Sequence, residues 1–254
     1  MPARAKPRGA TVRNLELLRC IATGPAEFSL KRLAEQSALP VSTVHRLIEP
    51  WVQRDLLEHD GPKSYRMGPE LFRLASLILQ KFEVQRLARP LLAALCKEWQ
   101  ETAALCLFSA STRSGAVAES IPSPHPLKYE LAVNSVVALG WGSLGRAILA
   151  YLPAPDIEAV LIKDAHGPLS RASLPPRKSM LRELALIRAR RYATYHSQSM
   201  NIAGISAPVL HADGRVIGSI GVIMPASRFS RSVQERLPAA VIESARKLGT
   251  LVTA

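Results

Sequence analysis

The sequence has few cysteines and no long apolar run. Cys20, Cys96 and Cys106 are widely spaced and stand among apolar residues, which favours buried, reduced thiols over disulfides or a zinc site. No stretch approaches the roughly eighteen consecutive apolar residues of a membrane-spanning helix. No apolar segment follows the basic N-terminus as in a signal peptide. We therefore expect no metal or other cofactor, no membrane partner and a cytoplasmic location.

The sequence also lacks a recognisable catalytic grouping. Its carboxylates are scattered, and its histidines show neither metal-ligand spacing nor pairing with a nucleophile. His196, beside Ser197 and Ser199, forms a weak cluster that is more typical of a polar strand end. We therefore predict that the protein is not an enzyme.

Acidic residues are too few to balance the basic ones. The chain has 33 Lys and Arg against 20 Asp and Glu, a formal charge of +13. Such an excess favours a polyanionic partner, because Lys and Arg release counterions when they bind phosphates. Residues 1–85 carry only +4 of it, so the excess is not confined to one segment. Charge alone leaves open a basic chain that is merely soluble.

The N-terminal third predicts a basic arm followed by a winged helix-turn-helix. Residues 1–10 have no periodicity and predict a flexible arm. A helix from Thr11 would end at Gly24-Pro25, with Leu15, Leu18, Ile21 and Ala22 on its inner face. Ser29 would cap a second helix and Pro40 would open a third. Two extended arms around Asp60-Gly61-Pro62 predict a hairpin, the wing, so the domain covers residues 11–68.

The third helix is the candidate reading helix, since the first residues of such a helix meet base edges in the major groove. Hydroxyl, imidazole and guanidinium groups there can bind phosphates or base edges. Basic and aromatic side chains on the wing could lie along the adjacent strand. The predicted DNA contacts are Ser42, Thr43, His45, Arg46, Lys63, Tyr65 and Arg66. A protein-binding module of the same shape remains an alternative.

The rest of the chain predicts a linker helix and an α/β domain. Residues 69–84 carry a stripe of Leu71, Leu74, Leu77 and Ile78, a plausible oligomer surface. Residues 85–254 alternate helices with strands, including a strand near Lys128–Val133 and a hairpin at Asp213-Gly214, which predicts a largely antiparallel sheet. The fold class is thus a two-domain α/β (α+β) protein.

A glycine-rich turn, Gly140-Trp141-Gly142-Ser143-Leu144-Gly145, precedes one predicted helix. A helix N-terminus offers free N–H groups to a carboxylate, and glycine lets a ligand approach the backbone. No Gly-Lys-Ser/Thr follows, so the turn is not a P-loop. The alternative is that the glycines only close a loop beneath Trp141.

A resemblance to the N-terminal domain and linker of the IclR family of bacterial regulators is carried by the segment FSLKRLAEQSALPVSTVHRLIEPWVQRDLLEHDGPKSYRMGPELFRLA. Typical sequences of that family contain stretches close to LPKSTVHRLL, GLV and YRLG. RLARPLLAALCKEWQETAAL, SLGRAILAYLP, ISAPVLHADGRVIGSIGV and PASRFS follow in the family's order. The resemblance covers about residues 11–252. It implies a winged helix-turn-helix, a GAF-like effector-binding domain, a homodimer or tetramer, and control of a catabolic operon.

The resemblance also implies an effector site between the glycine-rich turn and the last strands. Gly221 and Ile223 stand where some members have serines, and Gly204 where a cysteine is common, which predicts a roomier, more apolar site. We therefore expect an aromatic or branched carboxylate. Asn201 replaces a usual glycine and Val41 a usual lysine. The implied effector residues are Gly140, Trp141, Gly142, Ser143, Leu144, Thr194, Ile202, Gly204, Gly221 and Ile223.

Together these features predict a bacterial transcriptional regulator that binds double-stranded operator DNA. A small organic acid in the C-terminal domain would set its operator affinity through linkage between the two sites. A small-molecule sensor that acts only through protein contacts is the alternative.

Overall fold

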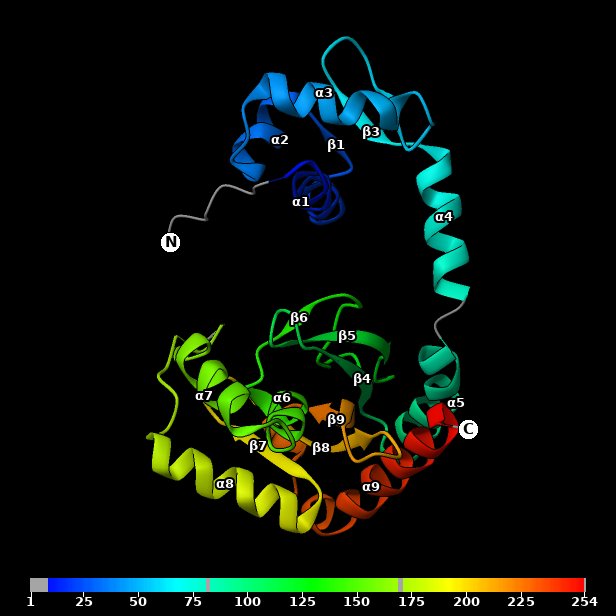
Figure 1. The fold of residues 1–254 in the computed structure, drawn as a ribbon. Helices are drawn as coiled ribbons and strands as arrows, with labels where there is room; N and C mark the ends of the chain where they lie inside the picture. Colours follow the sequence, from blue (N-terminus) through cyan, green and yellow to red (C-terminus); the bar gives the residue numbers. More distant parts are fainter. Residues whose placement is uncertain (1–8, 81–82, 169–170, 254) are drawn as a thin grey trace. The chain divides into compact units, whose positions relative to one another are not determined.

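A computed structural model describes residues 9–80, 83–168 and 171–253. The chain divides into two compact units, Met1–Phe82 and Glu83–Ala254 (Figure 1). They are called here the N-terminal unit and the C-terminal unit, and each has a hydrophobic core of its own. The predicted flexible arm, residues 1–10, falls mostly outside the described residues.

The N-terminal unit has the predicted order of helices and hairpin. Its three short strands pair antiparallel in the order β1-β3-β2. Ser29 caps α2 by accepting a hydrogen bond from the Arg32 N–H at 3.3 Å, and Gly61 turns the hairpin with φ +87°. The elements are α1 Ala10–Thr23, β1 Glu27–Phe28, α2 Leu30–Ser37, α3 Val41–Val52, β2 Leu57–His59, β3 Tyr65–Met67 and α4 Pro69–Gln80.

The buried face of α1 differs from the predicted one. Leu17, Cys20 and Ile21 enter the core, whereas Leu15 is 62% and Leu18 39% exposed, and Ala22 is exposed. Apolar residues occupy two neighbouring faces of this helix, so periodicity alone did not show which face packs inward. The prediction was correct for Ile21 only.

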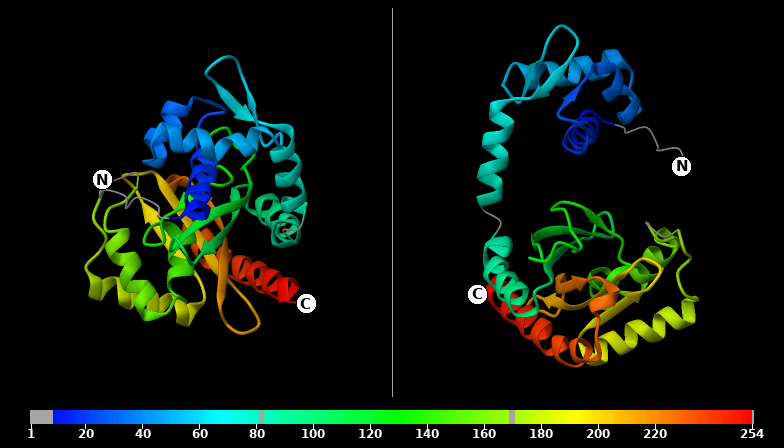
Figure 2. Two further views of the ribbon diagram at one scale, coloured as in Figure 1. Left: turned by 45° about the horizontal axis from the view of Figure 1, so that its top comes forward. Right: turned by 180° about the vertical axis from the view of Figure 1, so that it is seen from behind.

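The described strands of the C-terminal unit form one antiparallel sheet in the order β6-β5-β4-β9-β8-β7, which confirms the predicted sheet type. Helices α5 and α9 pack on one face and α6, α7 and α8 on the other (Figures 1 and 2). The elements are α5 Glu83–Trp99, β4 Thr102–Ser109, β5 Ser114–Ile121, β6 Val136–Val137, α6 Gly142–Leu149, α7 Ala154–Lys163, α8 Arg177–Arg190, β7 Ala193–Ser197, β8 Ile202–Leu210, β9 Val216–Met224 and α9 Arg231–Thr253.

The predicted strand over Lys128–Val133 is wrong. This segment is a loop, and the strand that pairs with β5 on the side away from β4 is the short β6. Side-chain bonds hold the loop in place of a strand ladder: the Thr102 hydroxyl donates to the Tyr129 carbonyl at 2.6 Å, and the Tyr129 hydroxyl donates to the Met200 carbonyl. The loop is thereby tied to the start of β4 and to the turn before β8.

The three cysteines are free and buried, as predicted. Among the described residues, no helix combines the length and the apolar character needed to cross a membrane.

Candidate functional site

The solvent-facing side of α3 carries most of the predicted reading residues. Ser42, His45 and Arg46 are exposed and Thr43 is half-buried, while Val44 and Ile48 on the opposite side are buried in the core. Among the described residues, Arg46 has no ion-pair partner in the structure. Its five donors are therefore available to a phosphate or a guanine edge.

Within the described part of the chain, the wing presents Lys63, which has no ion-pair partner there, and Arg66, which is paired. Lys63 is exposed near the tip. The Arg66 guanidinium donates to Glu58 Oε1 at 2.6 Å and lies 3.9 Å from Asp60 Oδ1. These carboxylates raise the pKa of Arg66, and a phosphate would compete with Glu58 for the Nε–H, while the other N–H groups of the guanidinium have no hydrogen-bond partner among the described residues.

Tyr65 is buried, whereas its prediction as a DNA contact assumed an exposed side chain. The residue is only 7% exposed and belongs to the core of the N-terminal unit. Its ring stacks on Phe28 at a centroid distance of 6.3 Å and lies 4.6 Å from His59. Side chains alternate along a strand, so Tyr65 points inward in β3 where Arg66 points outward.

Apolar side chains remain exposed on two helices of the N-terminal unit. On α4, Phe72 is 75% and Ile78 55% exposed, and Leu74 and Leu77 are also on the surface. On α1, Val12 and Leu15 are exposed. Clusters of this kind are typical of protein contact surfaces.

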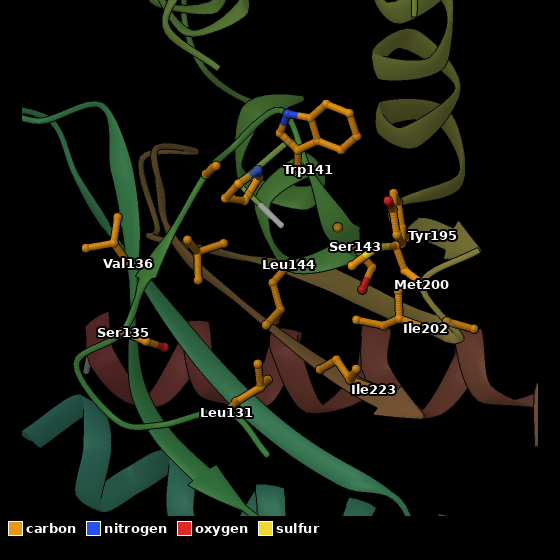
Figure 3. Close-up of a pocket in the computed structure, with 16 residues that line it drawn as sticks. Leu131, Ser135, Val136, Trp141, Ser143, Leu144, Tyr195, Met200, Ile202 and Ile223 are labelled. Atoms are coloured by element: carbon orange, nitrogen blue, oxygen red, sulfur yellow. The ribbon is translucent and has the colours of Figure 1, made fainter. Parts of the chain in front are cut away.

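The C-terminal unit contains a cavity of about 210 Å³ between α6, the sheet and the loop before β6. We call it the apolar cavity. Figure 3 shows Leu131, Leu144, Ile202 and Ile223 around it. Trp141 comes from the turn before α6 and Ser143 from the first turn of α6. Its lining residues are Leu131, Ser135, Val136, Val137, Ala138, Trp141, Gly142, Ser143, Leu144, Pro168, Tyr195, Met200, Ile202, Ala203, Gly204 and Ile223.

Small and polar residues of the sheet allow α6 to approach closely. Gly204 lies in one row across the sheet, between Tyr195 of β7 and Ile223 of β9. The buried Ser206 hydroxyl donates to Ser143 Oγ at 2.8 Å, and the buried Ser219 hydroxyl donates to the Leu144 carbonyl at 2.9 Å. The first turn of α6 is therefore fixed on the sheet, and the Ser143 hydroxyl keeps its own proton to donate to a ligand.

Asp164 holds the turn that precedes α6. The Gly140 N–H donates to Asp164 Oδ2 at 3.1 Å, and the Trp141 Nε1–H donates to the Asp164 carbonyl at 2.8 Å. Gly142 adopts φ +70° with open space around its missing side chain. The turn thus orients the Trp141 indole and directs the start of α6 towards the cavity.

The structure brings together part of the predicted effector set. Trp141, Gly142, Ser143, Leu144, Ile202, Gly204 and Ile223 line the apolar cavity, whereas Gly140, Thr194 and Gly221 do not. Gly140 is enclosed by Leu174 and Asp164. A Cβ on Gly221 would lie 2.0 Å from Ser206 Oγ, so Ser206, rather than the cavity, occupies the space that this glycine leaves. Thr194 lines a neighbouring cavity.

Sequence reasoning missed the residues that the loops and the short strand β6 contribute. Leu131, Ser135 and Val136 lie in or just after the segment wrongly predicted as a strand, and Met200 lies in the turn before β8. Tyr195 could have been found from its neighbour Thr194. The loop residues carried no signal, because irregular backbone has no periodicity to place its side chains.

The lining of the apolar cavity contains no Lys, Arg or His among the described residues. A carboxylate bound there would depend on the Ser143 hydroxyl and on the free N–H groups in the first turn of α6. The other walls are suited to an apolar body.

Two family models match the chain: "IclR helix-turn-helix domain" over residues 10–61 and "Bacterial transcriptional regulator IclR C-terminal" over residues 76–250. The chain is 22% identical over 243 residues to the HTH-type transcriptional regulator KipR of Bacillus subtilis, covering 94% of this chain and 96% of KipR. It is 26% identical over 242 residues to the HTH-type transcriptional regulator BhcR of Paracoccus denitrificans, covering 93% and 84%.

Solved structures share the fold. A putative IclR transcriptional regulator from Silicibacter sp. TM1040 superposes with a TM-score of 0.82 at 24% identity, covering 97% of each chain. An IclR homologue from Microbacterium hydrocarbonoxydans, solved in complex with 4-hydroxybenzoate, gives a TM-score of 0.78 at 20% identity, covering 95% of this chain and 98% of its own.

Proposed function

Because the chain belongs to the IclR family of bacterial transcriptional regulators, we propose that it binds operator DNA and that a small organic acid in the apolar cavity sets its operator affinity. The relatives named above are regulators, not enzymes. Ser42, Thr43, His45 and Arg46 read the major groove from α3, and Lys63 and Arg66 contact phosphates from the wing.

One observation carries the DNA-binding part of the proposal. The polar side of α3 is exposed and Arg46 has no ion-pair partner among the described residues, although α3 is otherwise anchored by Val44 and Ile48 in the core. An unpaired guanidinium on a rigid helix is already positioned to bind a base edge or a phosphate through bidentate hydrogen bonds.

The effector that we propose is a small carboxylate whose apolar body is either a single aromatic ring or a branched aliphatic chain. A volume of about 210 Å³ lies below the range of about 300–1,000 Å³ that is usual for pockets that hold drug-sized ligands, so the ligand is small. The apolar walls favour a hydrocarbon body, and Ser143 with the first turn of α6 receives the carboxylate. The Microbacterium relative binds a ligand of this class, 4-hydroxybenzoate.

We also propose that the protein acts as a homodimer or tetramer. The exposed apolar side chains of α1 and α4, with Leu15, Phe72 and Ile78 among the most exposed, would be covered by a second copy. A two-fold assembly would present two copies of α3 to the two half-sites of a palindromic operator.

The test is a mobility-shift titration with DNA from upstream of the protein's own gene. We expect Arg46→Ala to weaken specific binding by about tenfold or more, because a bidentate base contact contributes roughly 1–3 kcal/mol. Arg73→Ala is the matched control, since it removes the same charge from α4, where Arg73 pairs with Glu70. Binding should weaken steeply with salt.

Addition of aromatic and branched acids to the same titration tests the effector. A change in operator affinity with one of these acids supports the regulatory part. The absence of a specific shift at either salt concentration would favour the alternative, a sensor that acts through protein contacts.

A further inference from the structure

A second cavity, of about 460 Å³, adjoins the apolar cavity. Trp141 and Tyr195 line both cavities and so lie where the two cavities meet. The second cavity differs in character because its lining includes Arg146, Thr194, Ser197 and Ser199. We call it the polar annex.

Arg146 directs an unused donor into the polar annex. The residue is only 8% exposed. Its Nε–H donates to the Gly140 carbonyl at 3.1 Å, and Nη1 donates to both oxygens of Glu183 at 2.8 and 3.0 Å. Nη2 has no hydrogen-bond partner among the described residues. It is also not fully enclosed by protein atoms, because Trp99 Nε1 is the described side-chain atom that is both enclosed and without a partner. Nη2 therefore opens towards the cavity that Arg146 lines.

Neighbouring groups complete a site for an acceptor. The guanidinium carbon of Arg146 lies 5.3 Å from the centre of the Tyr195 ring, which fixes the plane of the guanidinium. The hydroxyl of Thr194 has no hydrogen-bond partner within the described chain. No Asp or Glu is among the described residues that line the annex; the carboxylate of Glu183, which pairs with Nη1 of Arg146, offsets part of the Arg146 charge but leaves Nη2 without a partner among the described residues.

We propose that the polar annex binds a second carboxylate of the effector, so that the regulator selects an acid with a carboxylate at each end of an apolar body. This inference rests on the proposed function of the apolar cavity. One carboxylate meets Ser143 and the first turn of α6, the body lies between Trp141 and Tyr195, and the second carboxylate accepts from Arg146 Nη2 and Thr194 Oγ1. Arg146 is the specificity-determining residue.

The test is isothermal titration calorimetry of the full chain with four probes: 4-methylbenzoate, 4-hydroxybenzoate, 1,4-benzenedicarboxylate and 4-(carboxymethyl)benzoate. We expect at least one dicarboxylate to bind about tenfold or more tightly than 4-methylbenzoate, because a hydrogen bond to a charged group contributes enough for a factor of that size. Arg146→Gln should remove this preference, so that the variant binds the dicarboxylates no more tightly than it binds 4-methylbenzoate.

Arg146 also pairs with Glu183, so Arg146→Gln could disturb the fold. Thr194→Val provides a second variant that keeps the side-chain shape, and it should reduce the dicarboxylate preference by a few-fold. Thr112→Val is its matched control, because Thr112 lies in the turn between β4 and β5 and lines neither cavity. This variant should bind all four probes with the affinities of the unmodified protein.

The outcomes separate the two proposals. If dicarboxylates and 4-methylbenzoate bind equally well and both alter operator binding, the annex proposal is overturned and the proposed function stands. A dicarboxylate preference that survives in both Arg146→Gln and Thr194→Val also overturns it. Failure of every probe to bind overturns the annex proposal and the aromatic effector together.

Discussion

Gly221→Ala should destabilise the C-terminal unit through one identifiable side chain, Ser206. An ideal Cβ at position 221 would lie 2.0 Å from Ser206 Oγ, 2.6 Å from Ser206 Cβ and 2.7 Å from the Ile205 carbonyl oxygen. Ser206 is fully buried and donates to Ser143, so it cannot rotate away freely. Because overpacking in a core costs about 1–3 kcal/mol, we expect the free energy of unfolding to fall by about 3 kcal/mol.

The companion substitution Ser206→Gly should cost about 2 kcal/mol by itself. It removes one hydrogen bond, about 1 kcal/mol, and places a glycine inside a strand, about 0.5–1 kcal/mol. In the double variant two of the three close atoms are absent, so the clash largely disappears. We expect the pair to cost about 3 kcal/mol, where simple addition predicts about 5 kcal/mol.

The assay is urea denaturation followed by far-UV circular dichroism, with each variant analysed in the transition of the C-terminal unit. Gly214→Ala is the control for the cycle. Gly214 has φ +83° and open space around it, so its replacement adds backbone strain without touching Ser206, and its effect should add to that of Ser206→Gly. Additive effects for Gly221→Ala and Ser206→Gly, within about 0.5 kcal/mol, would refute the assignment of the clash to Ser206.

Three other measurements follow from single residues. Tyr65→Phe should leave operator affinity unchanged, since the ring lies in the core. A tenfold loss of affinity in a mobility-shift assay would instead show that the Tyr65 hydroxyl contacts the DNA. Burial raises the pKa of the Cys106 thiol to about 12, so alkylation at neutral pH should reach Cys106 only after unfolding, as mass spectrometry can show. The Arg215 N–H and guanidinium lower the pKa of Asp213 from 3.8 to about 2. The Asp213–Arg215 pair therefore stabilises the folded state at pH values above the ordinary pKa of Asp213, and this effect is lost as the pH falls towards 2. Carboxyl NMR titration of Arg215→Ala should show that the pKa of Asp213 rises only part of the way towards 3.8, because the variant loses the guanidinium but keeps the backbone N–H that donates to Asp213.

Regular elements were predictable because their residues repeat with the helical or strand period. The capped start of α2 at Ser29, the hairpin at Gly61 and the antiparallel sheet all follow from local rules and are present in the structure. The errors arose where such rules do not choose between faces. Leu15 and Leu18 were predicted to be buried but are exposed, because two faces of α1 carry apolar residues and periodicity does not show which one packs inward.

The candidate site was only partly predictable for a different reason. The resemblance to the family placed Gly204 at the site, and the structure has it in the cavity lining. Gly221, which the resemblance also placed there, faces a neighbouring serine, a contact that only the sheet register shows. Leu131 reaches the cavity from a loop held by Tyr129. Such long-range hydrogen bonds leave no periodic trace in the sequence.

The walls of the apolar cavity differ in how freely they can evolve. The side formed by β8 and β9 is constrained, since Ser206 and Gly221 fit together and Ser206 also anchors α6. The side formed by Leu131, Ser135 and Met200 belongs to loops outside the strand ladders. Substitutions there can reshape the cavity without breaking a strand pair, so selection can retune the preferred ligand through the loops while the sheet preserves stability.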